Sequence, residues 1–143
     1  MRLLFVADPL EDFKIAKDSS FTMMREAAAR GHRLYACEPR DLVWERGGRV
    51  TARLREIALT SDPTAWFTEL ETPSTPLAEL DAVVMRKDPP FDSEYFYATH
   101  LLERAESHGA KVFNSPRALR DHPEKLSILE LPDHLPPPLV PRR

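Results

Sequence analysis

The stretch that decides the fold is LDAVVMRKDPPFD, at residues 80–92. Its first half is an apolar run with the length of a buried β-strand, and its second half is charged and carries two prolines. In an open α/β sheet, ligands bind at the carboxyl ends of strands. Charges of both signs at such a junction favour a zwitterionic or anionic ligand; a rigid loop with solvated charges is the competing interpretation.

A helix, a strand and a second helix are predicted after this junction. Asp92 is suited to cap a helix, because short side-chain oxygens accept the free N–H groups of a first turn. Apolar residues then recur at helical spacing, at Tyr95, Ala98, Leu102 and Ala105. Gly109 ends this helix, and residues 110–113 read as a strand. Ser115 followed by Pro116 predicts the start of a short helix.

A similar unit opens the chain. Residues 2–7 are nearly all apolar and predict a buried strand. Residues 10–17 lack clean periodicity and are expected to form a loop. Residues 18–20 are N-cap candidates for a helix that ends at Gly31, and residues 32–37 predict a second strand. The apolar face of the helix is expected to comprise Phe21, Met24 and Ala28, flanked by Met23 and Ala27.

The middle of the chain has a different pattern. Residues 42–45 and 50–54 alternate in polarity around Gly47 and Gly48, which predicts a β-hairpin. Trp44 is either a core anchor or a cover for a sheet edge. Residues 61–79, with three prolines, are expected to form a surface loop with a short helical turn.

These elements predict an α/β fold: a Rossmann-like, mostly parallel sheet flanked by helices, with an added β-hairpin. Residues 1–122 are expected to form the domain, and residues 123–143 the start of a connection to another part. Five of the fourteen prolines lie in the last twelve residues, and such a segment favours extended backbone.

Composition excludes several classes of protein. A net charge of −3 with 30% charged residues argues against a nucleic-acid binder. No apolar run reaches the roughly 18 residues of a membrane helix. The apolar start is too brief for a signal peptide, because Asp8 interrupts it, so a cytoplasmic location is expected. Cys37 is the only cysteine and is expected to be a buried strand thiol.

The glycines, histidines and serines of the sequence argue against several kinds of nucleotide, metal and catalytic site. The chain has only four glycines, all assigned to helix ends or to the hairpin, so neither a dinucleotide fingerprint nor a P-loop is available. The five histidines show no metal-ligand spacing, so no metal site is predicted. No nucleophile elbow is present, and Ser19 and Ser20 are better explained as capping residues than as nucleophiles, so no catalytic residue is predicted.

The candidate ligand-binding residues follow the predicted strands at residues 2–7 and 80–85. Arg86 is the first choice, because its fork of donors suits a carboxylate; an ion pair with Asp88 or Asp18 is the alternative. The N-terminus of the first helix can orient a ligand carboxylate or phosphate, and Asp18 can pair with a ligand ammonium. The expected substrate-binding residues are Asp18, Ser19, Ser20, Arg86, Lys87 and Asp88.

Three groups of residues resemble bacterial glutathione synthetases. They lie at 14–24, at 85–92 with 97–99 and 102–105, and at 114–116 with 119–121 and 124–126. Asp8-Pro9 and Trp66-Phe67 also fit in order. The resemblance covers essentially the whole chain and corresponds to the amino-terminal α/β domain that precedes the ATP-grasp domain of these enzymes.

The resemblance implies an ATP-dependent ligase. The intact enzyme joins γ-glutamylcysteine to glycine with ATP and Mg²⁺, and its amino-terminal domain forms one wall of the substrate cleft and contributes to subunit contacts, so a homo-oligomer is expected. By motif position, Lys125 corresponds to a lysine that helps hold ATP. Most ATP and Mg²⁺ contacts lie in the ATP-grasp part, so this chain alone is expected to be inactive. A stand-alone binding or interaction module derived from the family is the alternative.

Overall fold

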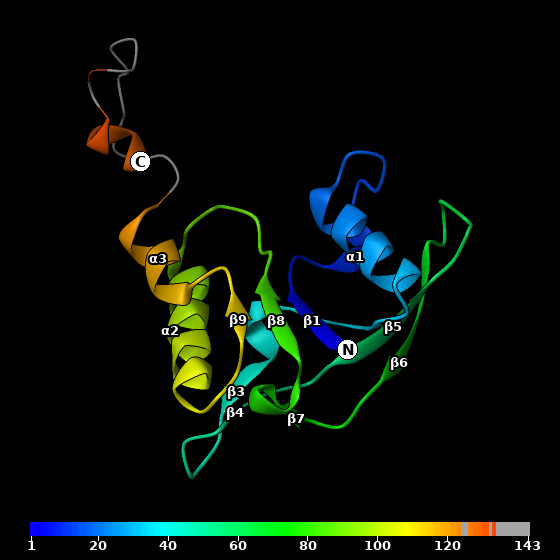
Figure 1. Ribbon diagram of the computed structural model, residues 1–143, viewed down its shortest axis with the longest axis horizontal. Helices are drawn as coiled ribbons and strands as arrows, with labels where there is room; N and C mark the ends of the chain where they lie inside the picture. Colours follow the sequence, from blue (N-terminus) through cyan, green and yellow to red (C-terminus); the bar gives the residue numbers. More distant parts are fainter. Residues whose placement is uncertain (124–125, 132, 134–143) are drawn as a thin grey trace.

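A six-stranded, mostly parallel sheet forms the centre of the protein, as the sequence predicts (Figure 1). The computed structural model describes residues 1–123, 126–131 and 133. The strand order is β6-β5-β2-β1-β8-β9, in which β2, β1, β8 and β9 run parallel and β5 and β6 are antiparallel additions. The strands are β1 Arg2–Val6, β2 Arg33–Cys37, β5 Arg55–Leu59, β6 Phe67–Glu71, β8 Ala82–Met85 and β9 Val112–Phe113.

The central strand β1 is buried on both faces, which explains its continuous apolar run. Leu4 pairs with Tyr35 on β2 and with Val83 on β8. Successive side chains of β1 point to opposite faces of the sheet. Leu4 and Val6 belong to one hydrophobic cluster, whereas Phe5 belongs to the other. Cys37 is 3% exposed, and burial raises the pKa of its thiol, which confirms the prediction of a buried strand thiol.

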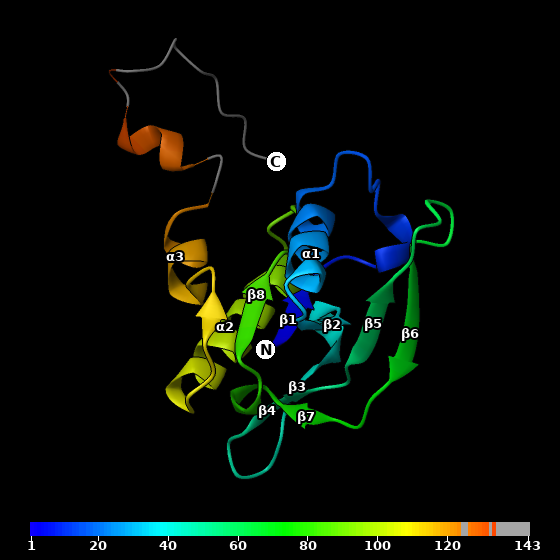
Figure 2. The same cartoon turned by 45° about the vertical axis from the view of Figure 1, so that its right-hand side comes forward.

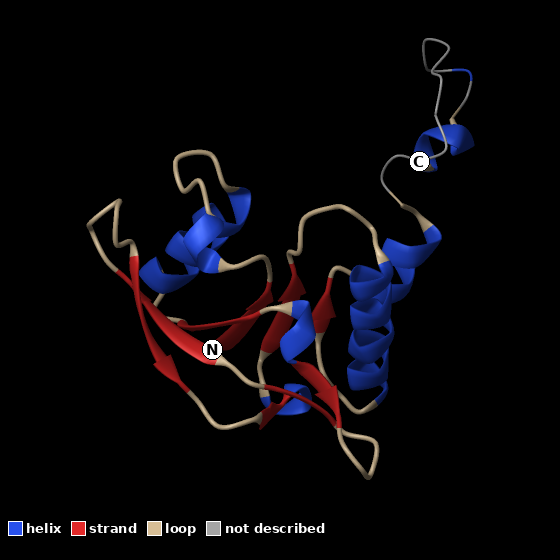
Figure 3. Cartoon of the chain, turned by 180° about the vertical axis from the view of Figure 1, so that it is seen from behind, coloured by secondary structure: helices blue, strands red, loops and turns tan. Residues whose placement is uncertain are grey.

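Helices cover the two faces of the sheet (Figures 2 and 3). The longest are α1 Ser19–Ala29 and α2 Ser93–Ser107, followed by α3 Pro116–Asp121. Short 3₁₀ helices are η1 Leu10–Asp12, η2 Pro39–Asp41, η3 Leu77–Glu79 and η4 Ser127–Glu130. Helix α1 packs through Met24 and Ala27 on the face of Phe5, and α2 packs through Leu102 on the opposite face. Helix α1 presents Met23 to solvent, where it is 42% exposed.

The predicted caps are present. Asp18 accepts a hydrogen bond from the Phe21 N–H, and Asp92 accepts one from the Tyr95 N–H, both at 2.9 Å. Ser115 caps α3, with Pro116 in its first position. Each cap satisfies a backbone donor that has no partner inside its helix.

The predicted hairpin forms a separate three-stranded sheet on the α2 face. Its strands are β3 Leu42–Trp44, β4 Val50–Ala52 and β7 Thr75–Pro76, in the order β3-β4-β7. Gly47 and Gly48 have φ values of 99° and 90°, which ordinary side chains rarely adopt. Trp44 is 62% exposed, which rules out the interpretation of this residue as a core anchor.

The prediction that residues 61–79 form a surface loop is wrong. This range contains β6, which pairs with β5 over its full length, and also β7. Strand β6 lies at the edge of the sheet, where Leu70 is 72% exposed. An edge strand needs no continuous apolar run, and Pro63 and Pro73 flank β6 without interrupting it. The predicted loop at residues 10–17 likewise contains η1, whose Leu10 is fully buried.

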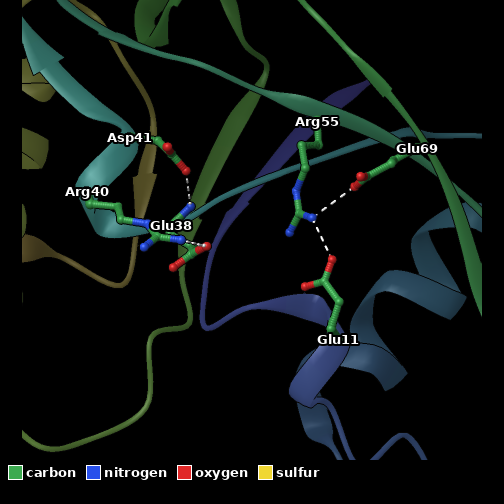
Figure 4. A network of polar contacts seen from close by, with 6 residues as sticks. All are labelled: Glu11, Glu38, Arg40, Asp41, Arg55 and Glu69. Atoms are coloured by element: carbon green, nitrogen blue, oxygen red, sulfur yellow. Dashed lines mark hydrogen bonds and ion pairs between the residues drawn. The ribbon is translucent and has the colours of Figure 1, made fainter.

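An ion-pair network ties the antiparallel edge to the segment before α1 (Figure 4). Arg55 on β5 donates to Glu11 on η1 and to Glu69 on β6, both at 2.9 Å. Burial by itself would raise the pKa of Glu11, but hydrogen bonds from its own backbone N–H and from Arg55 outweigh burial and lower this pKa. Nearby, Glu38 contacts Arg40 and Asp41 at η2. Arg55 therefore fixes the turn that leads from β1 toward α1.

We predict that Leu102→Ala destabilises the fold strongly. Leu102 is 0% exposed in the α2 core, and truncating a buried leucine to alanine costs about 2–5 kcal/mol. Leu70→Ala is the matched control, because its side chain is 72% exposed and its loss should cost less than about 0.5 kcal/mol. Urea denaturation measures both values. Equal losses would contradict the assignment of α2 to the core.

We also predict that Glu11→Gln destabilises the protein in a pH-dependent way. A lowered carboxyl pKa stabilises the fold above the ordinary pKa of 4.5, and this contribution is lost as the pH falls through the lower, folded-state pKa. Because Glu11 is largely exposed, the loss near neutral pH should be only about 0.5 kcal/mol. Urea midpoints of the two proteins should converge in acid. A constant difference at all pH values would contradict the Glu11–Arg55 contact.

Candidate functional site

The site lies where the neighbouring strands β1 and β8 end. The chain leaves β1 toward α1 and β2 on one side, whereas β8 connects to α2 and β9 on the other. This divergence creates a crevice at the carboxyl ends of the two strands, the usual ligand position in open α/β sheets. Asp8 follows β1, and Arg86, Lys87 and Asp88 follow β8.

Asp8 holds the loop after β8 in place. Its carboxylate lies 2.7 Å from the Lys87 Nζ and accepts a hydrogen bond from the Asp88 N–H at 2.8 Å. Burial works against the charge on Lys87, but the hydrogen bond and the negative charge of Asp8 outweigh burial and raise the pKa of Lys87. Lys87 also donates to the Asp88 carbonyl at 3.0 Å. The Lys87 ammonium is therefore engaged inside the loop.

Arg86 connects the end of β8 to the start of α1. Its Nε donates to the Ser20 hydroxyl at 2.9 Å, and its Nη2 donates to the Ser19 hydroxyl at 2.7 Å. In the described part of the chain Arg86 forms no ion pair, so the alternative of a bridge to Asp88 or Asp18 is not what the structure contains. Five of the six predicted residues thus lie together: Ser19 and Ser20 contact Arg86, and Asp18 and Asp88 line the same cavity as Arg86.

Two cavities flank Arg86 and Asp88, which line both of them. The larger, of about 420 Å³, is bounded by the β8–α2 loop, the start of α2 and the segment from Asn114 to Pro123. The smaller, of about 200 Å³, lies toward α1 and is lined by Asp8, Asp12, Phe13, Asp18, Ser20, Arg86 and Asp88.

The larger cavity has a mostly apolar wall with a few polar groups. Phe91 and Tyr95 pack with ring centroids 4.9 Å apart, and burial raises the pKa of Tyr95, so its hydroxyl keeps its proton at neutral pH. Helix α3, which contributes Leu119, is tied to α2 by an ion pair between Arg120 and Glu103. Such a mixture of apolar surface and few polar groups suits an organic ligand.

Several lining residues were not predicted from the sequence. Asp8 and Asp12 face the smaller cavity, and Tyr95, Asn114 and His122 line the larger one. The strand-end rule that selects Arg86 also applies to Asp8, since it lies two residues beyond the end of β1. Asn114 lies in one of the three groups of residues that resemble the family, whereas no sequence pattern marks His122, because its position depends on how α3 packs on α2.

Two features that commonly bind nucleotides or metals, a glycine-rich loop and a cluster of metal ligands, were sought among the described residues. The four glycines lie after the ends of α1 and α2 and in the hairpin turn, so none lies between a strand and the start of the next helix, where glycine-rich phosphate loops occur. Within the same residues, no group of three or more His, Cys, Asp or Glu side chains is placed to hold a metal ion. Lys125, the residue expected to contact ATP, lies outside the described residues. None of the described helices has the length and apolar composition that crossing a bilayer requires.

Comparison with known proteins gives a consistent result. The family model described as prokaryotic glutathione synthetase, N-terminal domain, matches residues 1–120. The glutathione synthetase of Nitrosomonas europaea is 51% identical over 143 residues, which cover 98% of this chain and 44% of the relative. That of Ralstonia nicotianae is 50% identical over 142 residues, covering 99% and 44%. That of Neisseria meningitidis serogroup B is 47% identical over 147 residues, covering 100% and 46%.

These matches confirm the resemblance seen in the sequence motifs. The chain spans less than half the length of the curated relatives it matches, and the matching model describes an amino-terminal domain. The family model covers most of this chain, and the relatives are about half identical to it. This chain therefore belongs to the family of prokaryotic glutathione synthetase N-terminal domains.

Proposed function

We propose that this chain is the substrate-side and subunit-contact domain of a cytoplasmic, homo-oligomeric glutathione synthetase, which joins γ-glutamylcysteine to glycine with ATP and Mg²⁺. The observation that carries this proposal is the crevice after β1 and β8, where Arg86 is held by two serine hydroxyls between two cavities. A fixed guanidinium beside carboxylates suits a ligand that carries both carboxylate and ammonium groups, as γ-glutamylcysteine does.

The candidate residues have different roles under this proposal. The expected substrate contacts line the smaller cavity and are Asp18, Ser20 and Arg86. Lys87 acts as a positioning residue, because its ammonium is paired with Asp8. Asp88 faces both cavities, and Ser19 orients Arg86. Lys125 is proposed to contact ATP at the boundary with the next domain.

Phosphate chemistry is assigned to the part of the enzyme that this chain does not include. Mg²⁺ and positive groups neutralise the phosphates during such a transfer. We expect that the chain alone does not hydrolyse ATP, because in this family most ATP and Mg²⁺ contacts lie in the ATP-grasp domain. We propose residues 1–122 as the domain and residues 123–143 as the connection to an ATP-grasp domain.

The subunit-contact role is supported by exposed aromatic side chains at the start of α2. Phe91, Phe96 and Tyr97 are 41%, 40% and 66% exposed and form one contiguous cluster. Exposed aromatic groups of this kind are enriched where proteins associate.

A chimera tests the proposed function. In it, this chain replaces the aligned 143 residues of the Nitrosomonas europaea relative, with which it shares 51% identity. We expect ADP formation that requires both γ-glutamylcysteine and glycine. The remainder of the relative without this chain, and this chain alone, should form none. A folded chimera that is inactive, or activity in either part alone, would contradict the proposal and favour a stand-alone interaction module.

A further inference from the structure

An exposed stripe runs along the outer face of α2, the helix at the flank of the molecule (Figures 1 and 3). The inner face of α2 packs on the sheet through residues that include Ala98 and Leu102. At about 3.6 residues per turn, a set of exposed residues falls within a sector of about 100° on the opposite side. They are Ser93, Phe96, Tyr97, His100, Arg104 and Ser107, and we call them the α2 stripe. The stripe has an aromatic centre, one permanent cation and a serine at each end.

The aromatic centre of the stripe has no cation of its own. The Phe96 ring meets Tyr97 edge-to-face at 5.9 Å and His100 at 4.6 Å, measured between ring centroids. The faces of aromatic rings are negative and attract cations. Among the described residues, guanidinium groups lie over the rings of Phe21 and Tyr35 but not over Phe96 or Tyr97. Both of these rings are exposed, so a cation from outside can reach them.

Arg104 is the cation of the stripe and has no acidic partner. No ion pair in the described part of the chain includes its guanidinium. The hairpin turn supports the side chain, because a Cβ at Gly48 would lie only 3.5 Å from the Arg104 Nη2. Phe96 lies two turns earlier on the same helix, about 12 Å away along its axis. The aromatic centre and the cation of one copy are therefore too far apart to satisfy each other.

We propose that two copies of this chain pair through their α2 stripes, with the helices antiparallel about a two-fold axis at His100. Such an interface is self-complementary, so each residue before His100 faces the residue equally far after it in the other copy. Arg104 of one copy then lies opposite Phe96 of the other, beside Tyr97, and this contact occurs twice. The small Ser93 and Ser107 lie opposite each other. This inference rests on the proposed subunit-contact role and adds the surface, the axis and the contacts.

Charge favours this arrangement over the other self-pairings that the structure offers. In a parallel pairing of α2, Arg104 would face Arg104, and like charges repel. The antiparallel pairing instead places each guanidinium on rings that have no cation. The edge strand β6 carries the carboxylate of Glu69 beside the exposed Leu70, and charges on an edge strand oppose pairing between copies. The α2 stripe is thus the surface whose own charges fit a second copy.

The proposed dimer leaves the crevice after β1 and β8 open. In the described part of the chain, no residue of the α2 stripe lines either cavity. Helix α2 runs back from the end of β8 toward the hairpin, so Arg104 lies away from the cavities. A single pair of helices buries less surface than the roughly 800 Å² per partner of a stable complex. We therefore expect a weak dimer, with a Kd on the order of 10 μM for this chain alone.

Sedimentation velocity of the full chain over a range of concentrations tests the contacts. Tyr97→Ala and Arg104→Ala should each raise the Kd about tenfold, because each substitution removes two contacts per dimer. Tyr97→Phe keeps the ring and should change the Kd less than about twofold. Leu70→Ala is the matched control, because it removes an exposed apolar side chain on another surface, and it should also stay within about twofold. Tyr97 and Arg104 are exposed, so the variants should keep the thermal melt of the wild type.

Cross-linking with a short bismaleimide tests the position of the axis. His100→Cys should cross-link on its own, because position 100 faces itself in the dimer. Ser93→Cys and Ser107→Cys should each fail to cross-link alone and should cross-link when mixed, because each faces the other. The wild type is the control, since Cys37 is its only cysteine and is buried.

The outcomes separate this inference from the proposed function. A chain that stays monomeric up to about 1 mM, a Kd that neither alanine variant changes, or cross-linking of Ser93→Cys alone would overturn the inference, even if the chimera is active. A dimer with the expected sensitivities together with an inactive chimera would overturn the proposed function and leave this interface standing.

Discussion

The contact on which the site depends is the Arg86 guanidinium between two serine hydroxyls. It joins the end of β8 to the first turn of α1, two elements separated by 66 residues in the chain. One donor alone would fix a distance, but donation from Nε and Nη2 also fixes the plane of the guanidinium. The orientation of the wall between the two cavities therefore follows from this single side chain. A lysine at the same place would supply charge without this planar geometry.

The parallel centre of the sheet is what brings these groups together. Because β1 and β8 are direct neighbours, Asp8 at the end of one reaches Lys87 and the Asp88 N–H at the end of the other. The chain departs in opposite directions from the two strands, and among the described residues two cavities lie beside Arg86 at this point. On the far side of α1, Arg55 holds η1, and η1 carries Asp12 to the edge of the smaller cavity. The geometry of the site is thus supported from both ends of the sheet.

Local signals predicted most of the parallel half of the fold. Asp18, Asp92 and Ser115 are caps in the structure because capping depends on a few adjacent residues. Strand β6 was missed because an edge strand is defined by its partner, and its own side chains are largely polar or exposed. Arg86 was identified by its position after a strand. Lys87 was expected to face a ligand, and only the pairing of β1 with β8 shows that Asp8 occupies its ammonium.

The central claim of this account is physical. The end of β8 and the start of α1 are energetically coupled through Arg86. A double-mutant cycle with Arg86→Met and Ser20→Ala, measured by urea denaturation, tests the claim most directly. The account predicts a coupling free energy of about 1–2 kcal/mol, as expected for a charge-assisted hydrogen bond. Additivity of the two substitutions within about 0.3 kcal/mol would contradict it.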